Sequence, residues 1–288
     1  MISKALLSEI KKDLFDLGAD PKKSLGQNFL VNPLVYESIV YHLDPQPDET
    51  IVEIGPGLGT LTRHLAAKSS KIIAVEKDSA FVSHLRKKYT NNGNVSIIED
   101  DILRWSPPTV FSSAASLSTH HSPLITSGYS VVGNLPYYLS SHLLRIIFET
   151  WPMPRRLVFM LQLEVAQRIT RRPPNMSMLS VLCQYYCTVR IAQKVPSGDF
   201  YPRPKVNSAI AVFDPLPPRL TDPERIQFFK LASAGFSQNR KQLVNNLSRE
   251  LKIDRKTVLE KFTQAGFDPR RRAETLTIED WVSLLRYF

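Results

Sequence analysis

A short apolar stretch at residues 51–54 runs directly into a turn that contains Gly55, Gly57 and Gly59, and a helical pattern begins at Thr60. A buried strand, a glycine-rich turn and a helix in this order are typical of the first βα unit of a doubly wound α/β sheet. Because glycine has no Cβ, its backbone can approach a ligand closely. A dinucleotide-binding turn would need a further glycine where Thr60 stands, so the spacing favours a nucleoside ligand without a pyrophosphate, although a tight turn without a ligand would look the same.

Acidic residues follow the next two predicted strands. The strand at residues 71–75 ends at Glu76, where a carboxylate can accept hydrogen bonds from ribose hydroxyls. The strand at residues 95–98 is followed by residues 99–101, all of them acidic, and a carboxylate there can accept a hydrogen bond from an adenine amino group. Spacing alone leaves open which of the three acids faces a ligand, and a solvated acidic strand end has the same pattern.

A further candidate site follows an apolar run at residues 129–132. Asn134, Leu135, Pro136 and Tyr137 stand between this predicted strand and a helical pattern, where open α/β sheets bind their ligands. The amine of adenine is a poor nucleophile, and two acceptors aimed at its N–H groups would turn its lone pair towards an electrophile. The Asn134 amide and the Leu135 carbonyl, whose direction the following proline fixes, can supply those acceptors. Tyr137 offers a ring for base stacking, although Asn and Pro are also ordinary turn residues.

Two prolines make residues 200–208 extended, and Phe200 at the start is a candidate second ring facing a flipped-out base. An ordinary buried aromatic residue is an equal alternative. Cys183 and Cys187 are four residues apart on a predicted helix and read as buried thiols in a reducing compartment. The serine-rich segment at residues 106–128 includes paired histidines but brings no third ligand into view, so we expect a long surface loop and no metal site.

The chain is basic, with a net charge of +10 and a pI of about 9.6, which favours a polyanionic partner. Proline-rich residues 214–218 form the best linker, so we predict domains at residues 1–214 and 215–288. The helical segment 219–288 holds 14 Lys and Arg against 9 Asp and Glu, so half of the net charge lies in a quarter of the chain. Its densest basic spots are candidate phosphate contacts: Arg240, Lys241, Arg270, Arg271 and Arg272.

Together these motifs resemble the ribosomal RNA adenine N6,N6-dimethyltransferases of the small-subunit type. The resemblance runs in order from about residue 22 to the end of the chain. It rests on residues 25–30 in a basic, non-periodic arm (residues 22–30), residues 52–59, residues 133–138, Phe159-Met160-Leu161-Gln162 with Glu164, Phe200-x-Pro202-x-Pro204-Lys205-Val206, and Phe236-x-Gln238-x-Arg240-Lys241.

The resemblance implies a Rossmann-like seven-stranded methyltransferase sheet with a small all-α C-terminal domain. It implies S-adenosylmethionine as methyl donor, without a metal. The donor-binding positions of the family, together with the glycines of the turn, fall on Asn28, Leu30, Gly55, Gly57, Glu76, Asp101 and Asn134, and the family pattern prefers Asp101 to Asp100. Its base-handling positions fall on Asn134, Leu135, Pro136, Tyr137 and Phe200. The implied substrate is a pair of adjacent adenosines in the hairpin loop near the 3′ end of small-subunit ribosomal RNA, each of which receives two methyl groups.

Some positions depart from the family pattern. Asn207 replaces a common Asp, Asn239 a frequent Arg and Leu163 a frequent Lys, and we expect the last two to affect RNA affinity more than chemistry. Asn207 fits the related branch that modifies large-subunit RNA and confers macrolide resistance, which is the nearest alternative. A non-catalytic ribosome-assembly factor on the same fold is a second alternative. We further expect a monomeric, cytoplasmic protein with no membrane segment.

Overall fold

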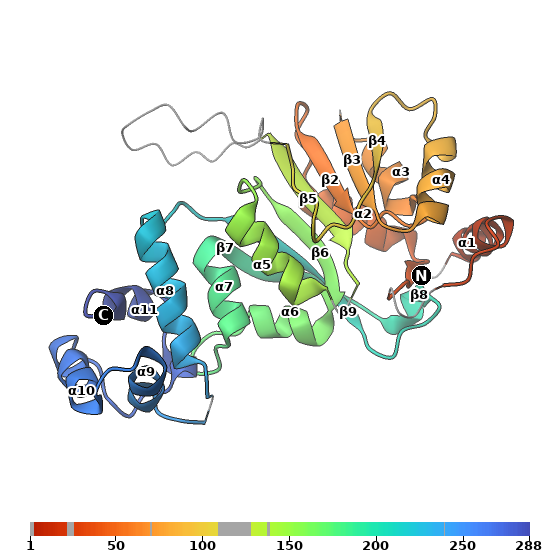
Figure 1. Cartoon of the computed structure of the whole chain (residues 1–288). Coiled ribbons are helices and arrows are strands. Elements are labelled where there is room, and N and C mark those ends of the chain that lie inside the picture. The colour runs from red at the N-terminus through yellow and green to blue at the C-terminus, as the bar shows by residue number, and fades with distance from the viewer. Residues whose placement is uncertain (1–2, 22–25, 70, 109–127, 137–138, 239) are drawn as a thin grey trace. The chain divides into compact units, whose positions relative to one another are not determined.

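The computed structural model describes residues 3–21, 26–69, 71–108, 128–136, 139–238 and 240–288. Within these ranges a seven-stranded sheet has the order β4-β3-β2-β5-β6-β9-β7 (Figure 1). The first five strands in that order are parallel, and β9 runs antiparallel to β6. The strands are β2 (Thr50–Ile54), β3 (Lys71–Glu76), β4 (Val95–Glu99), β5 (Tyr129–Asn134), β6 (Leu157–Gln162), β7 (Cys187–Val195) and β9 (Ser208–Pro215). This order confirms the predicted Rossmann-like methyltransferase sheet.

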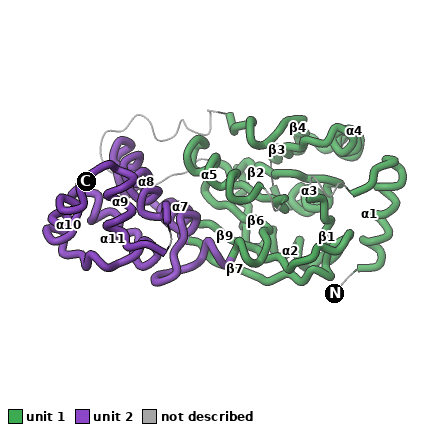
Figure 2. Tube along the Cα trace, turned by 60° about the horizontal axis from the view of Figure 1, so that its bottom comes forward, with its two compact units in different colours: residues 1–166, 189–215 green, residues 167–188, 216–288 purple. Residues whose placement is uncertain are grey.

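The chain divides into two compact units, which Figure 2 colours separately. Unit 1 comprises Met1–Ala166 and Val189–Pro215, and unit 2 comprises Gln167–Thr188 and Leu216–Phe288. The helices of unit 1 are α1 (Lys4–Asp16), α2 (Pro33–Leu43), α3 (Thr60–Ala66), α4 (Ser79–Lys88) and α5 (Ser140–Thr150). Helix α6 (Leu163–Ile169) and strand β7 each cross a boundary between the units.

Different helices cover the two faces of the sheet. Val158 and Met160 of β6 belong to one buried cluster with apolar residues of α2 and α3. The intervening Phe159 lies 6.0 Å from the ring of Phe213 in β9, and Phe213 lies 6.2 Å from the ring of Phe148 in α5. Because successive side chains of a strand point to opposite faces, α2 and α3 cover one face and α5 covers the other.

The sheet reverses its strand order between β2 and β5, since β3 and β4 lie on one side of β2 whereas β5 and β6 lie on the other. A doubly wound sheet has a crevice at such a point, outside the carboxyl ends of the strands. Gly133 of β5 lies opposite Ile54 of β2. A Cβ at Gly133 would be 2.7 Å from the Ile54 carbonyl oxygen, so this close approach requires glycine directly before Asn134.

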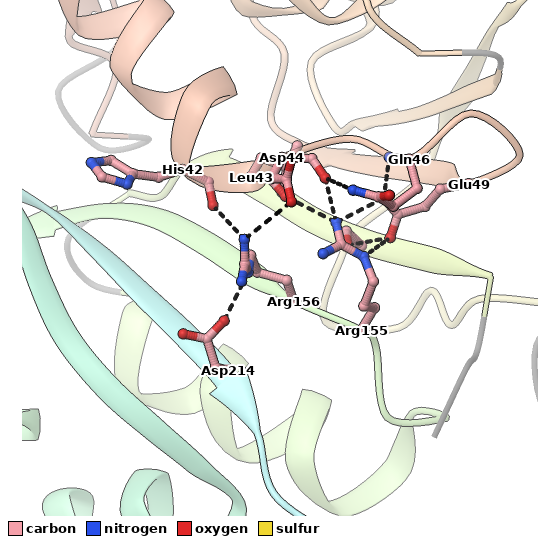
Figure 3. Close-up of polar contacts among 9 residues, drawn as sticks. His42, Leu43, Asp44, Gln46, Glu49, Arg155, Arg156 and Asp214 are labelled. Atoms are coloured by element: carbon pink, nitrogen blue, oxygen red, sulfur yellow. Dashed lines mark hydrogen bonds and ion pairs between the residues drawn. The ribbon is translucent and has the colours of Figure 1, made fainter. Parts of the chain in front are cut away.

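A partly buried arginine, Arg155, fixes the end of helix α2 to the sheet (Figure 3). The Nη2 atom of Arg155 donates hydrogen bonds to the carbonyls of Leu43 and Asp44 at 2.9 and 2.8 Å. The Nε atom of the same side chain donates to Glu49 at 2.8 Å, and Glu49 is buried. The carbonyls at the end of α2, which lack partners within the helix, are therefore satisfied by a side chain from the segment just before β6.

Unit 2 contains the helices α7 (Met178–Tyr186), α8 (Asp222–Gly235), α9 (Leu243–Leu251), α10 (Arg255–Gln264) and α11 (Ile278–Leu285). Its core includes the buried Phe228, Leu247, Phe262 and Trp281. Residues 167–188 group with this unit because Val181 and other α7 residues pack in the same core, whereas the sequence assigns them to domain 1–214. The predicted boundaries, as limits of independently folding domains, stay a prediction.

One local prediction is wrong. Cys183 and Cys187 do not share a helix, because α7 ends at Tyr186 and Cys187 begins β7. Both thiols are buried, as expected. The serine-rich segment lies outside the described residues from 109 to 127, including the paired histidines.

Candidate functional site

One continuous cavity in unit 1 extends along the carboxyl ends of β2, β3, β4 and β5. It connects the glycine turn after β2 with the Asn134 loop after β5, which is the arrangement that the sequence predicts for a donor and a nucleobase meeting in one site. The residues lining it that the sequence also predicts are Asn28, Leu30, Gly55, Gly57, Glu76, Asp100, Asp101, Asn134 and Pro136. Helix α2 contributes Tyr36 and Ile39 to the wall.

The glycine turn adopts backbone conformations that other residues rarely take. Gly57 has a φ of +56°, in the left-handed region, and an added Cβ would lie 3.3 Å from the Phe29 ring. Its N–H donates a hydrogen bond to the Glu76 carboxylate at 3.0 Å. The absence of a side chain at Gly57 therefore keeps the cavity wall open and lets the turn approach both Phe29 and Glu76.

Glu76 ends β3 and is held by backbone donors. Besides Gly57, the N–H groups of Lys77 and Asp78 donate to it at 2.8 and 2.9 Å. Burial raises the pKa of Glu76 above its ordinary value, and these backbone hydrogen bonds act in the opposite direction. The carboxylate is thus fixed in orientation at the point where ribose hydroxyls are expected.

Asp101 follows β4 and forms an ion pair. Its Oδ2 accepts from the Lys77 ammonium at 2.8 Å and its Oδ1 from the Leu103 N–H at 3.0 Å. The Lys77 contact holds the pKa of Asp101 below its ordinary value, so this carboxylate is ionised and able to accept from an adenine amine. Asp100 lines the same cavity, so the choice between the two acids still rests on the family pattern.

The Asn134 amide is oriented by the arm. Its Nδ2 donates to the main-chain oxygen of Asn28 at 3.0 Å, while the Asn28 side chain donates to the Gly26 carbonyl at 3.0 Å. With its amino group engaged in this way, Asn134 keeps its Oδ1 as an acceptor for a ligand in the cavity. One of the two predicted acceptors is therefore held in place by a residue that is distant in sequence.

The second predicted acceptor lies next to Asn134. The Leu135 N–H donates to the Met160 carbonyl at 3.2 Å, and the Leu135 side chain is 1% exposed. Both the backbone and the side chain of this residue are therefore held in place. Among the described residues none donates a hydrogen bond to the Leu135 carbonyl. Pro136 lines the cavity, and Tyr137 lies outside the described residues.

Phe200 is in strand β8 (Phe200–Tyr201) and is only 4% exposed. It belongs to the buried cluster that includes apolar residues of α2 and α3, and it is not among the residues that line the cavity. Its role as a second ring beside a base stays a prediction. In this conformation the ring contributes to the core.

The predicted RNA-contacting cations of unit 2 differ in how they are held. Arg240 and Lys241 are exposed, and among the described residues neither forms an ion pair. Arg270 is 84% exposed and pairs with the carboxylate two residues earlier at 3.1 Å, and Arg272 is half-exposed. Arg271 is committed inward, since it bonds Asp280 at 2.9 Å and lies over the Phe267 ring. These contacts hold Arg271 within its own unit, and its contact with RNA stays a prediction.

Sequence reasoning missed Glu53. This residue lies within β2, is 1% exposed and lines the cavity. Its Oε2 atom has no hydrogen-bond partner among the described residues. Burial raises the pKa of Glu53 to about 8, and the nearby charge of Glu76 acts in the same direction. An acid inside an otherwise apolar strand was the signal in the sequence, because a buried carboxyl group without a partner is costly unless a ligand uses it.

The family model for ribosomal RNA adenine dimethylase matches residues 18–288. The chain belongs to the ribosomal RNA adenine dimethylase family. It is an enzyme that methylates adenines of ribosomal RNA, with S-adenosylmethionine as the methyl donor. The non-catalytic alternative is therefore set aside.

Relatives of this dimethylase cover nearly the whole chain. The ribosomal RNA small subunit methyltransferase A of Dehalococcoides mccartyi is 35% identical over 281 residues, 97% of this chain and 92% of that protein. The protein of the same name from Moorella thermoacetica is 36% identical over 272 residues, 93% of each chain. Among solved structures, the 23S rRNA methyltransferase ErmE has a TM-score of 0.69 at 25% identity over 90% of this chain and 98% of that one.

A dimethyladenosine transferase from Plasmodium falciparum, with a TM-score of 0.69 at 22% identity, shares the dimethylase fold over 89% of this chain and 95% of that one. None of the described helices is both long and apolar enough to cross a membrane. Within the described part of the chain, no group of three or more His, Cys, Asp or Glu side chains is placed to hold a metal ion.

Proposed function

We propose that this dimethylase converts two adjacent adenosines in the 3′-terminal hairpin loop of small-subunit ribosomal RNA to N6,N6-dimethyladenosine, and so takes part in small-subunit biogenesis. The observation that carries the proposal is the continuous cavity between the glycine turn and the Asn134 loop. The names of the 35–36% identical relatives support the small subunit as the source of the RNA. The large-subunit branch is represented by the solved structure of the 23S rRNA methyltransferase ErmE, which is less similar to this chain, at 25% identity.

The donor would occupy the end of the cavity formed by the turn and the strand ends. Glu76 would accept hydrogen bonds from the ribose hydroxyls and Asp101 from the adenine amine. Gly55 and Gly57 would let the backbone of the turn approach the ligand closely. The Glu53 carboxyl lines the same cavity with an unpartnered Oε2, and the positive charge of a bound donor would favour its ionised form. Asn28 and Leu30 of the arm line the same cavity, and Asn134 is shared between the donor and the base.

The base would enter at Asn134. S-adenosylmethionine supplies an electrophilic methyl group when bound, so the protein needs to position the amine and needs no metal. The Asn134 Oδ1 and the Leu135 carbonyl would each accept one N–H of the target amine and turn its lone pair towards the methyl group. Such positioning, rather than a strong base, is the main contribution of these residues. Pro136, Tyr137 and Phe200 would hold the base, since an unstacked base needs flat apolar partners.

RNA would also contact unit 2. Arg240, Lys241, Arg270 and Arg272 carry exposed side chains that suit phosphate binding, whereas the contacts of Arg271 favour a structural role. The proposal assigns methyl transfer to residues 1–214 and RNA contact to residues 215–288. It takes the protein to be a cytoplasmic monomer, which fractionation and sedimentation test.

Methylation of purified particles tests the proposal. The protein is incubated with methyl-labelled donor and either unmethylated small subunits or large-subunit RNA, and the RNA is digested and analysed by mass spectrometry. We expect dimethyladenosine at two adjacent positions of the small-subunit hairpin. Label in large-subunit RNA alone would contradict the proposal and favour the macrolide-resistance branch. Asn134→Ala should transfer no methyl groups, and the exposed Asn91→Ala serves as the matched control.

A further inference from the structure

The arm that lines the donor cavity pairs with the segment that carries Phe200. Strand β1 (Phe29–Leu30) runs antiparallel to β8, with Phe29 opposite Tyr201 and Leu30 opposite Phe200. These two short strands form a sheet of their own, separate from the seven-stranded sheet. A donor-contacting residue and a predicted base-contacting residue are therefore direct neighbours across one strand pair.

Two hydrogen bonds extend this pairing beyond the strands. The Asn32 Nδ2 donates to the Asp199 Oδ2 at 3.0 Å, between residues that are 167 positions apart in the chain. The Val31 N–H donates to the Asp199 main-chain oxygen at 2.7 Å. Asn32 is buried, and its own Oδ1 caps helix α2 by accepting from the Leu34 N–H at 3.2 Å. We call β1, β8 and the Asn32–Asp199 bond the clamp.

The far side of the clamp is also fixed. The short 3-10 helix Ser197–Asp199 directly precedes β8. The Ser197 N–H donates to the Asn207 Oδ1 at 2.9 Å, and the Leu163 N–H donates to the Asn207 main-chain oxygen at 2.9 Å. Asn207, a departure from the family pattern, therefore ties the Phe200 segment to the end of β6.

The β1 side of the clamp reaches the donor cavity and Asn134. Asn28, Phe29 and Leu30 all line the donor cavity, and the Asn28 carbonyl holds the Asn134 amide. A donor that contacts the arm would order β1, and a base that contacts Phe200 would order β8. Because the two strands are bonded to each other, ordering one reduces the entropy that the other loses when its ligand binds.

We propose that the clamp couples the two substrates, so that RNA bound at the Phe200 segment raises the affinity of the arm for the donor, with Asn32 and Asp199 as positioning residues. The inference rests on the proposed placement of donor and base in the cavity. Coupling between two sites is reciprocal, and typical values change an affinity by about 5- to 150-fold. Since the clamp has few bonds, we expect a factor of about five at the low end of that range.

The test measures binding of radiolabelled S-adenosylhomocysteine by equilibrium dialysis, to the protein alone and to the protein saturated with unmethylated small-subunit RNA. Asn32→Asp keeps a capping oxygen for helix α2 but sets one carboxylate against another across the clamp. The exchanged pair, Asn32→Asp with Asp199→Asn, restores a hydrogen bond with donor and acceptor reversed. We expect a coupling factor of about five in the wild type, near one in Asn32→Asp, and restored in the exchanged pair.

A loss of protein stability alone would not be reversed by the exchanged pair in this way, which separates positioning from folding. Equal coupling in Asn32→Asp and wild type, or no coupling in the wild type, would overturn the proposal while leaving the function intact. If the wild type bound no S-adenosylhomocysteine, the donor site itself would be refuted and the clamp proposal with it.

A second measurement needs no variant. Hydrogen exchange of the Val31 amide, which donates across the clamp to Asp199, reports on its closure. Adding RNA without donor should slow this exchange at least severalfold, whereas the amide of Val131 in β5, the central strand of the sheet, should exchange at the same rate with and without RNA. Unchanged exchange at Val31 with bound RNA would contradict the coupling.

Discussion

Glu53 makes a prediction about stability that depends on pH. Its carboxyl group is fully buried and its pKa is raised from 4.5 to about 8. In the unfolded chain the group ionises near its ordinary value, whereas in the folded protein it keeps its proton up to about pH 8. Between these pH values the folded state binds more protons than the unfolded state, so Glu53 reduces stability as the pH rises.

The size of the effect follows from the shift. Each pH unit within the window changes the free energy of unfolding by about 1.4 kcal/mol, so raising the pH from about 5.5 to about 7.5 costs about 3 kcal/mol through this group. Glu53→Gln removes the titration and keeps the shape of the side chain. The free energy of unfolding of the variant should therefore rise by about 3 kcal/mol relative to the wild type over that range.

Chemical denaturation of both proteins without donor, at pH values between about 5.5 and 8.5, measures this difference, and comparing the two proteins cancels the other titrating groups. Glu99→Gln is the matched control, because Glu99 ends β4 of the same sheet with a half-exposed side chain. Its difference from the wild type should not vary with pH over this range. A constant difference for Glu53→Gln as well would refute the reasoning, since it would mean that Glu53 ionises near its ordinary pKa.

Three further predictions concern the site and its supports. Asn134→Ala should abolish methyl transfer and leave RNA binding nearly unchanged in filter-binding assays; persisting transfer would refute the two-acceptor account. Arg240→Ala with Lys241→Ala should weaken RNA binding and reduce the slope of log K against log[salt] by about 1.5, and an unchanged slope would remove both residues from the contact. Arg155→Ala should lower the free energy of unfolding by about 3–5 kcal/mol in denaturant titrations, because it removes the arginine charge that compensates the buried Glu49 carboxylate. A loss below about 1 kcal/mol would show that the pair is no more than a surface salt bridge.

The parallel sheet was predictable from the sequence because its signals are local. Each strand from β2 to β5 is a short apolar run, and glycine, an acid or asparagine stands at or directly after its end. The carboxyl ends of parallel strands lie on one edge, so residues such as Gly57, Glu76 and Asn134 were expected to meet there. The cavity confirms that they do.

Other features depend on contacts that no local pattern records. Cys187 continues a helical spacing but begins a strand, because pairing in the sheet overrides the periodicity. Arg271 looks like one of three equivalent cations in the sequence, yet Asp280 and Phe267 hold it inward. The position of Glu53 in the cavity wall was not predicted, because a single acid within an apolar run does not change the prediction of a buried strand.

The cavity is therefore built from two kinds of structure with different local stability. Glu76 and Asn134 are at the ends of strands in the centre of the sheet, where opening would require much of the core to unfold. Asn28 and Leu30 are on an arm that a two-residue strand pair and a few hydrogen bonds hold in place. Because elements with few bonds open at low free energy, the arm is the part of the site that a bound ligand can order most. The strand ends present the carboxylates, while the Asn28 carbonyl of the arm orients the Asn134 amide, so the acceptor proposed for the base depends on the arm being in place.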